Sequence, residues 1–218
     1  MEKVIIKSEV EEEDIHIKKI VEAVNSLDFY SMKLTIKQAI QAGISTVDII
    51  RQGVLKGLEE SGEMGLILAA EALDGELVSI DEDERKKLAE SRNYSGKVVI
   101  GTIQGDIHNL GKSIIIAIMR SYGMDIIDLG VDIPPEKFKE AACKEDVKVV
   151  GISYLLSSAE PAIKRAMSLL KNGDLANKVK VILGGAAASA EMMEETNADA
   201  YAVDALQGAE IIDKWLRS

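Results

Sequence analysis

The chain has 218 residues, of which 47% are hydrophobic and 4% aromatic, and its formal net charge is −11 at pH 7. A core of aliphatic side chains is therefore expected, in one large domain or two ordinary ones. The acidic balance argues against nucleic acid as a partner, because phosphate backbones are bound by clustered Lys and Arg. No apolar run approaches the roughly 20 residues that cross a bilayer, and no signal segment is visible, so we expect a cytoplasmic protein without membrane contact.

Residues 1–90 predict an all-α domain. Apolar residues recur at helical spacing in four segments, around residues 15–24, 32–40, 47–58 and 66–73. Four helices with short connections indicate a four-helix bundle. Ser45 is expected to cap the third helix, and the alanine-rich fourth should permit close approach of a neighbour or a ligand.

A charged run and a polar stretch predict a linker between the helical domain and the rest of the chain. The charged run covers residues 81–87 and the polar stretch residues 91–96. We therefore place the domain boundary between residues 90 and 91, and expect the region 74–96 to act as a hinge.

Residues 91–218 predict a second domain, of the α/β class. Short β-branched runs alternate with amphipathic segments, which indicates a five-stranded parallel sheet of the Rossmann-like (flavodoxin-like) type. The expected strands are Val98–Ile103, Asp125–Leu129, Val147–Tyr154, Val179–Leu183 and Ala200–Val203. The expected helices are Lys112–Tyr122, Pro135–Lys144, Glu160–Lys171, Ser189–Thr196 and Ala209–Leu216.

The single cysteine, Cys143, excludes an internal disulfide and suits a reducing compartment. It lies near Phe138, Ala141 and Ala142 in an expected helix, so it is predicted to be a buried small hydrophobic residue.

Three motifs follow three of the expected strands, at the edge where ligands bind in such sheets. The first is the loop Gly105–Gly111, which contains Asp106, His108 and Gly111 in an Asp-x-His-x-x-Gly pattern. The second is Ser153 and Leu155, with 41 residues between Gly111 and Ser153. The third is Gly184-Gly185-Ala186, with 28 residues between Leu155 and Gly184.

This series resembles, in order and spacing, the B12-binding module shared by methionine synthase, base-off mutases and methanogen-type methyltransferases. The helices ahead of it resemble the cap domain of corrinoid proteins in methyl-transfer systems for methylamines, methanol, betaines or methoxylated aromatics. The segment Asn197–Ala205 also resembles the family's final strand, near the nucleotide tail of the cofactor. The resemblance implies that the cofactor is cobalamin or a related corrinoid.

The resemblance also implies roles for individual residues. His108 would be the lower axial ligand of cobalt, displacing the cofactor's own base, and Asp106 would accept the other ring N–H of His108. Glycine at the strand ends would leave room for the displaced tail. The residues implied to contact the cofactor are Gly105, Asp106, Ile107, His108, Asn109, Gly111, Ser153, Leu155, Ser157, Gly184, Gly185, Ala186, Tyr201 and Ala202.

Each of these residues has an ordinary structural explanation when it is taken alone. His108 could be a solvated loop residue, and Asp106 an N-cap or turn former. Gly184-Gly185 could be a common turn, and Ser153 a strand-end hydroxyl. Only the complete series favours the cofactor site.

Two positions depart from the family pattern. Ala159 stands where methionine synthase has a serine that extends the hydrogen bonds of the Asp–His pair, so the proton relay is not carried over. The stretch Gly62–Gly65 is shorter than the Phe/Pro-containing segment usual in the cap. The side chains that shield the upper face of the cofactor are therefore not identified.

The implied function is that of a methyl carrier. A substrate-specific methyltransferase would transfer a methyl group to Co(I), and methyl-Co(III) would then be presented to a second methyltransferase with a thiol or tetrahydrofolate acceptor. The chain contains no recognisable pocket for a methyl donor, so it is expected to be a non-catalytic subunit. A B12-dependent sensor or regulator and the cobalamin subunit of a mutase are the alternatives.

Overall fold

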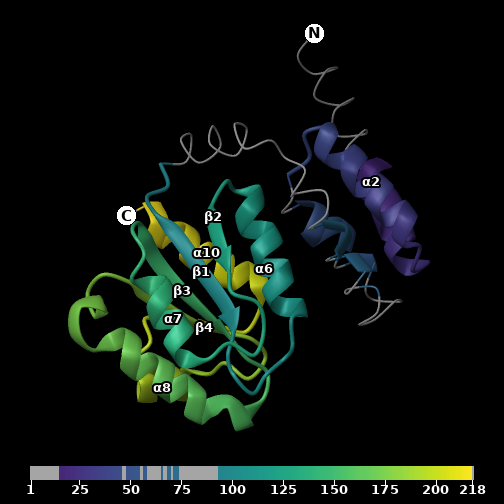
Figure 1. The fold of residues 1–218 in the computed structure, drawn as a ribbon. Coiled ribbons are helices and arrows are strands. Elements are labelled where there is room, and N and C mark those ends of the chain that lie inside the picture. The colour runs from purple at the N-terminus through teal and green to yellow at the C-terminus, as the bar shows by residue number, and fades with distance from the viewer. Residues whose placement is uncertain are drawn as a thin grey trace. The chain divides into compact units, whose positions relative to one another are not determined.

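The fold was analysed in a computed structural model, which describes residues 15–45, 48–54, 56–57, 65, 68–69, 71–73 and 93–217 (Figure 1). The chain divides into two compact units, Met1–Ile80 and Asp81–Ser218. The expected domain boundary, the charged run 81–87 and most of the expected hinge and of the stretch Gly62–Gly65 lie outside the described residues.

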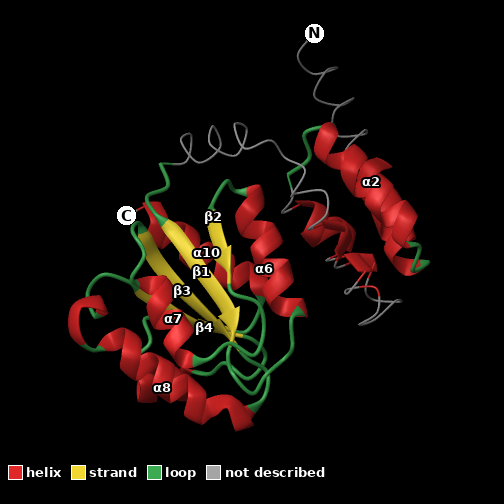
Figure 2. Cartoon of the chain, in the orientation of Figure 1, coloured by secondary structure: helices red, strands yellow, loops and turns green. Residues whose placement is uncertain are grey.

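The described residues of the first unit are helical or lie in the turns between helices (Figure 2). Residues 15–25 form one helix, and α2 spans Phe29–Gln41. Asp28 caps α2, because its carboxylate accepts a hydrogen bond from Ser31 N at 3.1 Å. The buried side chains of α2 follow helical spacing: Met32, Ile36 and Ala39. The expected second helix is thus confirmed.

The third helical segment begins as expected and then departs from the α-helix. Ser45 Oγ accepts a hydrogen bond from Asp48 N at 3.1 Å, as an N-cap does. The following residues, Ile49–Val54, are π-helical, whereas their spacing predicts an α-helix. Gly53 weakens the intrinsic preference for the α-helix, so packing against the first helix sets the local geometry.

Two glycines of the third segment allow a close approach to the first helix. A Cβ at Gly53 would lie 2.8 Å from Ile20 Cγ2, and a Cβ at Gly57 would lie 2.6 Å from Val24 Cβ. The sequence predicts such an approach at the fourth helix, of which only a few residues are described. In the described part, the third segment provides it.

The second unit contains the expected five-stranded parallel sheet, with strand order β2-β1-β3-β4-β5. Each strand agrees with its expected range to within one residue at either end. The strands are β1 (Lys97–Thr102), β2 (Asp125–Asp128), β3 (Val147–Ser153), β4 (Lys180–Gly184) and β5 (Ala200–Ala202).

Helices cover both faces of the sheet, which confirms the Rossmann-like fold class (Figure 1). Helices α6 and α10 pack together on one face, and α7 and α8 pack together on the other. The helices are α6 (Leu110–Ser121), α7 (Pro135–Ala142), α8 (Glu160–Lys171), α9 (Ala190–Thr196) and α10 (Ala205–Arg217). None of the helices in the described ranges is long and apolar enough to cross a bilayer.

Helix α10 begins at Ala205, four residues before the expected start. Asp204 Oδ1 accepts a hydrogen bond from Gln207 N at 2.8 Å, so Asp204 caps this helix. Gly208 lies inside the helix because a Cβ there would come within 2.8 Å of Ile115 Cδ1 on α6. Gly208 is thus a point of close contact between α10 and α6.

The prediction that Cys143 is buried is wrong, because Cys143 is exposed. Helix α7 ends at Ala142, and Cys143 is its C-cap. Phe138, Ala141 and Ala142 occupy the buried face, and the next residue along the chain is rotated away from that face.

Four strands end in one row at the carboxyl edge of the sheet. Thr102 pairs with Ser153, Ser153 pairs with Gly184, and Gly184 pairs with Ala202. The strand order reverses between β1 and β3, because β2 is added on one side of β1 and β3 on the other. Ligands bind near this switch point in sheets of this type. The loops that carry the three sequence motifs therefore start side by side.

At the opposite edge, Asp199 joins three elements before β5 begins. Its carboxylate pairs with the Lys171 ammonium, accepts from Lys180 Nζ at 3.0 Å and accepts from Val181 N at 2.7 Å. Burial opposes the charge, but these hydrogen bonds outweigh it and hold the pKa of Asp199 below its ordinary value.

We expect Asp199→Asn to reduce the free energy of unfolding by about 1 kcal/mol at pH 7, because the charge-assisted hydrogen bonds are lost. A lowered carboxyl pKa stabilises the fold above the pKa of the unfolded chain, and this contribution disappears as the pH falls through the folded value. The difference between Asp199→Asn and the parent protein should therefore shrink below about pH 4.

Urea unfolding at several pH values measures this difference. Asp125→Asn is the control, since the side chain of Asp125 forms an exposed ion pair with Lys97 at 3.4 Å within the described part of the chain. A difference for Asp199→Asn that is constant from pH 7 to pH 3 would contradict the prediction.

Candidate functional site

The site is built on the loop between β1 and α6, which turns sharply after the strand. Gly105 has φ +88°, and Asp106 N donates to Ile103 O at 3.1 Å. The buried side chain of Thr102 binds the other end of the loop, since its Oγ1 donates to His108 O at 3.0 Å. The loop is thus held to the end of β1 at both of its sides.

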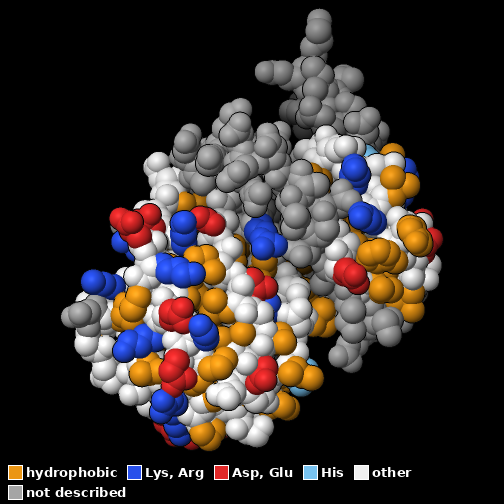
Figure 3. All heavy atoms as spheres, viewed as in Figure 1, with side chains coloured by type: hydrophobic (Ala, Val, Ile, Leu, Met, Phe, Trp, Pro, Cys, Tyr) orange, Lys and Arg blue, Asp and Glu red, His pale blue; other side chains and the backbone are white. Residues whose placement is uncertain are grey.

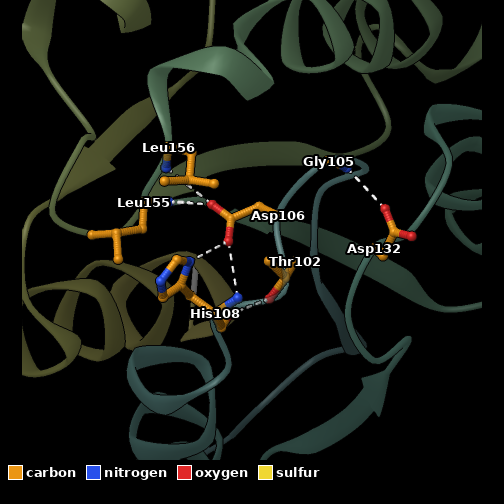
Figure 4. Close-up of polar contacts among 7 residues, drawn as sticks. All are labelled: Thr102, Gly105, Asp106, His108, Asp132, Leu155 and Leu156. Atoms are coloured by element: carbon orange, nitrogen blue, oxygen red, sulfur yellow. Dashed lines mark hydrogen bonds and ion pairs between the residues drawn. The ribbon is translucent and has the colours of Figure 1, made fainter.

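The carboxylate of Asp106 accepts four hydrogen bonds in the site (Figure 4). Its Oδ1 lies 2.9 Å from His108 N and 2.7 Å from His108 Nδ1. Its Oδ2 accepts from Leu155 N at 2.6 Å and from Leu156 N at 3.0 Å. Asp106 is 1% exposed, so one buried carboxylate joins the loop after β1 to the loop after β3.

These contacts determine the charge of Asp106. Burial raises its pKa, but the hydrogen bonds from Leu155, His108 and Leu156 outweigh burial and lower the pKa of Asp106 to about 2. Asp106 is therefore an anion at neutral pH and can only accept hydrogen bonds.

The anion sets the state of the imidazole of His108. Because Asp106 Oδ1 is an acceptor, His108 Nδ1 carries a hydrogen, and the lone pair of neutral imidazole is then on Nε2. The side chain of His108 is 50% exposed. His108 Nε2 is therefore an oriented nitrogen that can ligate a metal atom of a bound cofactor.

The structure brings most of the expected site residues to the carboxyl edge of the sheet. The loop after β1 holds Gly105, Asp106, Ile107, His108 and Asn109, and the first turn of α6 holds Gly111. Ser153 ends β3, Leu155 follows it, and Ser157 opens a 3₁₀ turn, while Gly184, Gly185 and Ala186 lie at and after the end of β4. Ala202 ends β5.

Tyr201 lies on a different face of the sheet from the expected site residues at the strand ends. A Cβ at Gly208 of α10 would lie 3.5 Å from Ala202 Cβ, so Ala202 points to the face covered by α6 and α10. Its register partners Gly184 and Ser153 share that face. Tyr201 packs against the core on the opposite face.

The glycines of the first and third motifs differ in what surrounds them. Gly105 and Gly111 have no neighbouring atom within 4 Å of an added Cβ, and the nearest to Gly184 is 4.0 Å away. Gly185 has φ +117°, and a Cβ there would lie 2.0 Å from Tyr154 O. Gly185 is thus required by the close approach of the loop after β3, and the other three leave open space.

The comparisons with known proteins agree with this geometry. Residues 96–211 match the family described as B12 binding domain. A corrinoid protein of Desulfitobacterium hafniense is 32% identical over 83% of this chain and 88% of its own length. The chain belongs to the corrinoid proteins.

Two proteins from Methanosarcina barkeri are similar to this corrinoid protein over most of its length. The trimethylamine corrinoid protein is 30% identical over 85% of this chain and 89% of its own. The structure of the monomethylamine corrinoid protein superposes with a TM-score of 0.66 and 25% identity, covering 90% of this chain and 96% of that one. The cofactor is cobalamin or a related corrinoid, as the sequence predicts.

The residues of this corrinoid protein fit such a cofactor. His108 offers one nitrogen, and large apolar side chains stand exposed at the same edge of the sheet. These side chains are Ile107, Leu155, Leu156 and Val203, exposed by 73%, 40%, 40% and 53%. Elsewhere on the visible face of the second unit, hydrophobic side chains are mixed with charged side chains of both signs (Figure 3).

Leu156, Val203 and a buried lysine also lie in the site region and are not among the expected site residues. Leu156 supplies one of the four donors to Asp106. Lys112, only 2% exposed, lies 2.7 Å from both carboxylate oxygens of Asp128 and fixes the first turn of α6 to the end of β2. The sequence does not indicate that this charged residue of α6 is buried, because its partner Asp128 is 16 residues further along the chain, on β2.

The structure accommodates Ala159, the departure from the family pattern. Ala159 is buried, and its N donates to Leu156 O at 3.0 Å. Four donor groups satisfy the carboxylate of Asp106 without a hydroxyl at position 159. The hydroxyl of the neighbouring Ser158 is not one of these four donors. The Asp–His pair is thus supported by main-chain N–H groups.

We expect Gly185→Ala to reduce the free energy of unfolding by about 2–4 kcal/mol, because it adds a steric clash with Tyr154 O to an unfavourable φ. Gly173→Ala is the matched control, since Gly173 has φ +72° and open space around an added Cβ. Its cost should be about 1 kcal/mol. Chemical denaturation of both variants measures the two effects, and equal losses would show that the contact with Tyr154 is unimportant.

Proposed function

We propose that this corrinoid protein binds its cofactor base-off, with His108 as the lower axial ligand, and carries a methyl group between two methyltransferases. The first would be specific for a methylated substrate, and the second would use a thiol or tetrahydrofolate acceptor. The observation that carries the proposal is the Asp106–His108 pair, with Nε2 directed away from the carboxylate at the carboxyl edge of the sheet. The names of the relatives, corrinoid proteins for trimethylamine and monomethylamine, support a methyl-transfer system.

When bound, the corrinoid supplies a cobalt atom that accepts a methyl group as Co(I) and gives it up from Co(III). The protein supplies the support for this exchange. His108 is in a loop that Thr102 and Asp106 hold at its main chain, so the imidazole is oriented before the cofactor arrives.

Asp106 keeps the imidazole in the tautomer that can ligate a metal. Its pKa of about 2 means that it remains an anion beside Nδ1 at neutral pH. A hydrogen bond from the far nitrogen to a carboxylate raises the basicity of the ligating nitrogen. Since the other three donors are main-chain N–H groups, the carboxylate stays in place when the ring moves.

We further propose that the displaced tail of the cofactor lies on the sheet face covered by α6 and α10. Ser153, Gly184 and Ala202 leave a row of small side chains on that face at the ends of three strands. Gly111, at the start of α6, has open space beside it. Ile107, Leu155 and Leu156 would then cover apolar parts of the corrin and exclude water around His108.

A methyl-transfer assay tests the carrier function against the two alternatives. The full chain is loaded with hydroxocobalamin, reduced, and mixed with a methylamine and a candidate methyltransferase from the same genome. A carrier turns over methyl groups when a thiol acceptor and second methyltransferase are added. A sensor, or the subunit of a mutase, would bind the cofactor without this turnover.

We expect His108→Ala to bind cobalamin more weakly and base-on, because the cofactor's own base is no longer displaced. The visible spectrum of the reconstituted protein should therefore change to that of cobalamin bound by its own base. His16→Ala is the control, since His16 lies in the other unit. An unchanged spectrum in His108→Ala would contradict ligation by this residue.

We expect Asp106→Asn to lower the affinity for cobalamin by about 10- to 100-fold, the range typical of partners of metal-bound histidines. The asparagine amide can take two orientations, and in each its NH₂ group faces another donor. These donors are Leu155 N and Leu156 N in one orientation and His108 in the other. Titration with hydroxocobalamin measures the affinity, and Asp125→Asn, at the opposite edge of the sheet, is the control. Equal affinities of the two variants would contradict the role of Asp106.

A further inference from the structure

A second carboxylate contacts the histidine loop from the side opposite Leu155 and Leu156. Asp132 lies in the loop between β2 and α7. Its Oδ1 accepts a hydrogen bond from Gly105 N at 2.8 Å (Figure 4). Its own N donates to Asp106 O at 3.1 Å. Asp132 therefore holds two adjacent residues of the histidine loop, one through its side chain and one through its main chain.

The backbone on both sides of this contact has an unusual conformation. Asp132 has φ +55° and Gly105 has φ +88°. A left-handed conformation at a residue other than glycine costs of order 1 kcal/mol and persists where the surroundings hold it. Here Ile133 N donates to Thr102 O at 2.9 Å, and Gln104 N donates to Ile133 O at 2.9 Å. The turn at Asp132 is thus fixed to the end of β1.

The end of β2 and the loop after it make contacts near both ends of the histidine loop. Asp132 binds Gly105 at the beginning, and Asp128 binds Lys112 just beyond the end. Asp128 also accepts from Gly130 N at 2.9 Å, which fixes its own loop. The histidine loop is therefore held from β2 as well as from β3.

Asp106 is the residue at which these two sources of support meet. Its main chain is held by Asp132, and its carboxylate by Leu155 and Leu156. The ring of His108 is positioned only through Asp106 among the hydrogen bonds described. A shift in the main chain of Asp106 would therefore move the carboxylate relative to the ring.

We propose that Asp132 is a positioning residue for the axial ligand. By binding Gly105 N through its carboxylate, beside the main-chain contact of its own N with Asp106 O, it holds the Asp106–His108 pair in the geometry that presents Nε2 and strengthens the bond between His108 and cobalt. This inference rests on the proposed function, since it assumes that His108 ligates the corrinoid.

Two substitutions separate the hydrogen bond from the backbone strain. Asp132→Gly removes the acceptor for Gly105 N and suits the left-handed φ. Asp132→Asn keeps an oxygen acceptor and also tolerates this φ. Asp146→Gly is the matched control, because Asp146 is an aspartate with φ +68° in the turn before β3, at the other edge of the sheet.

The experiment has one measurement with cobalamin and one without it. Full-length protein with ¹⁵N-labelled histidine is loaded with cobalamin and reduced to Co(II), and its EPR spectrum is recorded. Coordination by a ¹⁵N imidazole splits the cobalt lines into doublets, which gives the fraction with His108 bound. NMR of the apoprotein reports the tautomer of His108, and its signals are readily assigned because the chain has two histidines.

We expect Asp132→Gly to lower the equilibrium constant for His108 coordination roughly two- to tenfold, the range for loss of one hydrogen bond. Its apoprotein should also show a smaller share of the tautomer with hydrogen on Nδ1. Asp132→Asn should restore both values to within about twofold of the parent. Asp146→Gly should match the parent in both, whatever its effect on stability.

The outcomes distinguish this inference from the proposed function. A parent protein without the ¹⁵N doublet would contradict ligation by His108. A parent with the doublet, together with an Asp132→Gly variant that keeps the same doublet fraction and tautomer, would overturn the role of Asp132 alone. If Asp132→Gly does not fold, Asp132→Ala is compared with Asp146→Ala, which adds the same backbone strain, and the same two readings decide.

Discussion

The arrangement of the site depends on one buried carboxylate. Asp106 accepts hydrogen bonds from His108 N, His108 Nδ1, Leu155 N and Leu156 N, and these outweigh the cost of burying its charge. Without Asp106, the loops after β1 and β3 would have no direct link through a side chain of the motif. The same contacts orient the imidazole, so one set of hydrogen bonds both packs the two loops together and positions the proposed metal ligand.

The sheet explains how residues distant in sequence reach this carboxylate. β1 lies between β2 and β3, so the loops of both neighbours flank the histidine loop. The paired strand ends Thr102, Ser153, Gly184 and Ala202 bring the other motifs to the same edge. Ligands bind at this edge in doubly wound parallel sheets, and the proposed cofactor site needs only one protein ligand from it.

Much of this fold could be predicted from the sequence, because β-branched runs and amphipathic spacing mark local structure directly. The residues that could not be predicted depend on contacts across the fold. The expected helix begins at Ala209 and omits Gly208, whose place inside α10 depends on its close contact with Ile115 of α6. Cys143 was assigned to a buried face from its neighbours, and the end of α7 one residue earlier exposes it. Asp132 is 27 residues from Gly105, so no motif spacing connects them.

The donors of Leu155 and Leu156 have a consequence for how this site can vary among related proteins. Both donate through peptide nitrogen, which every amino acid except proline possesses. The side chains at these two positions can therefore change in size or polarity while the two main-chain hydrogen bonds to Asp106 are kept.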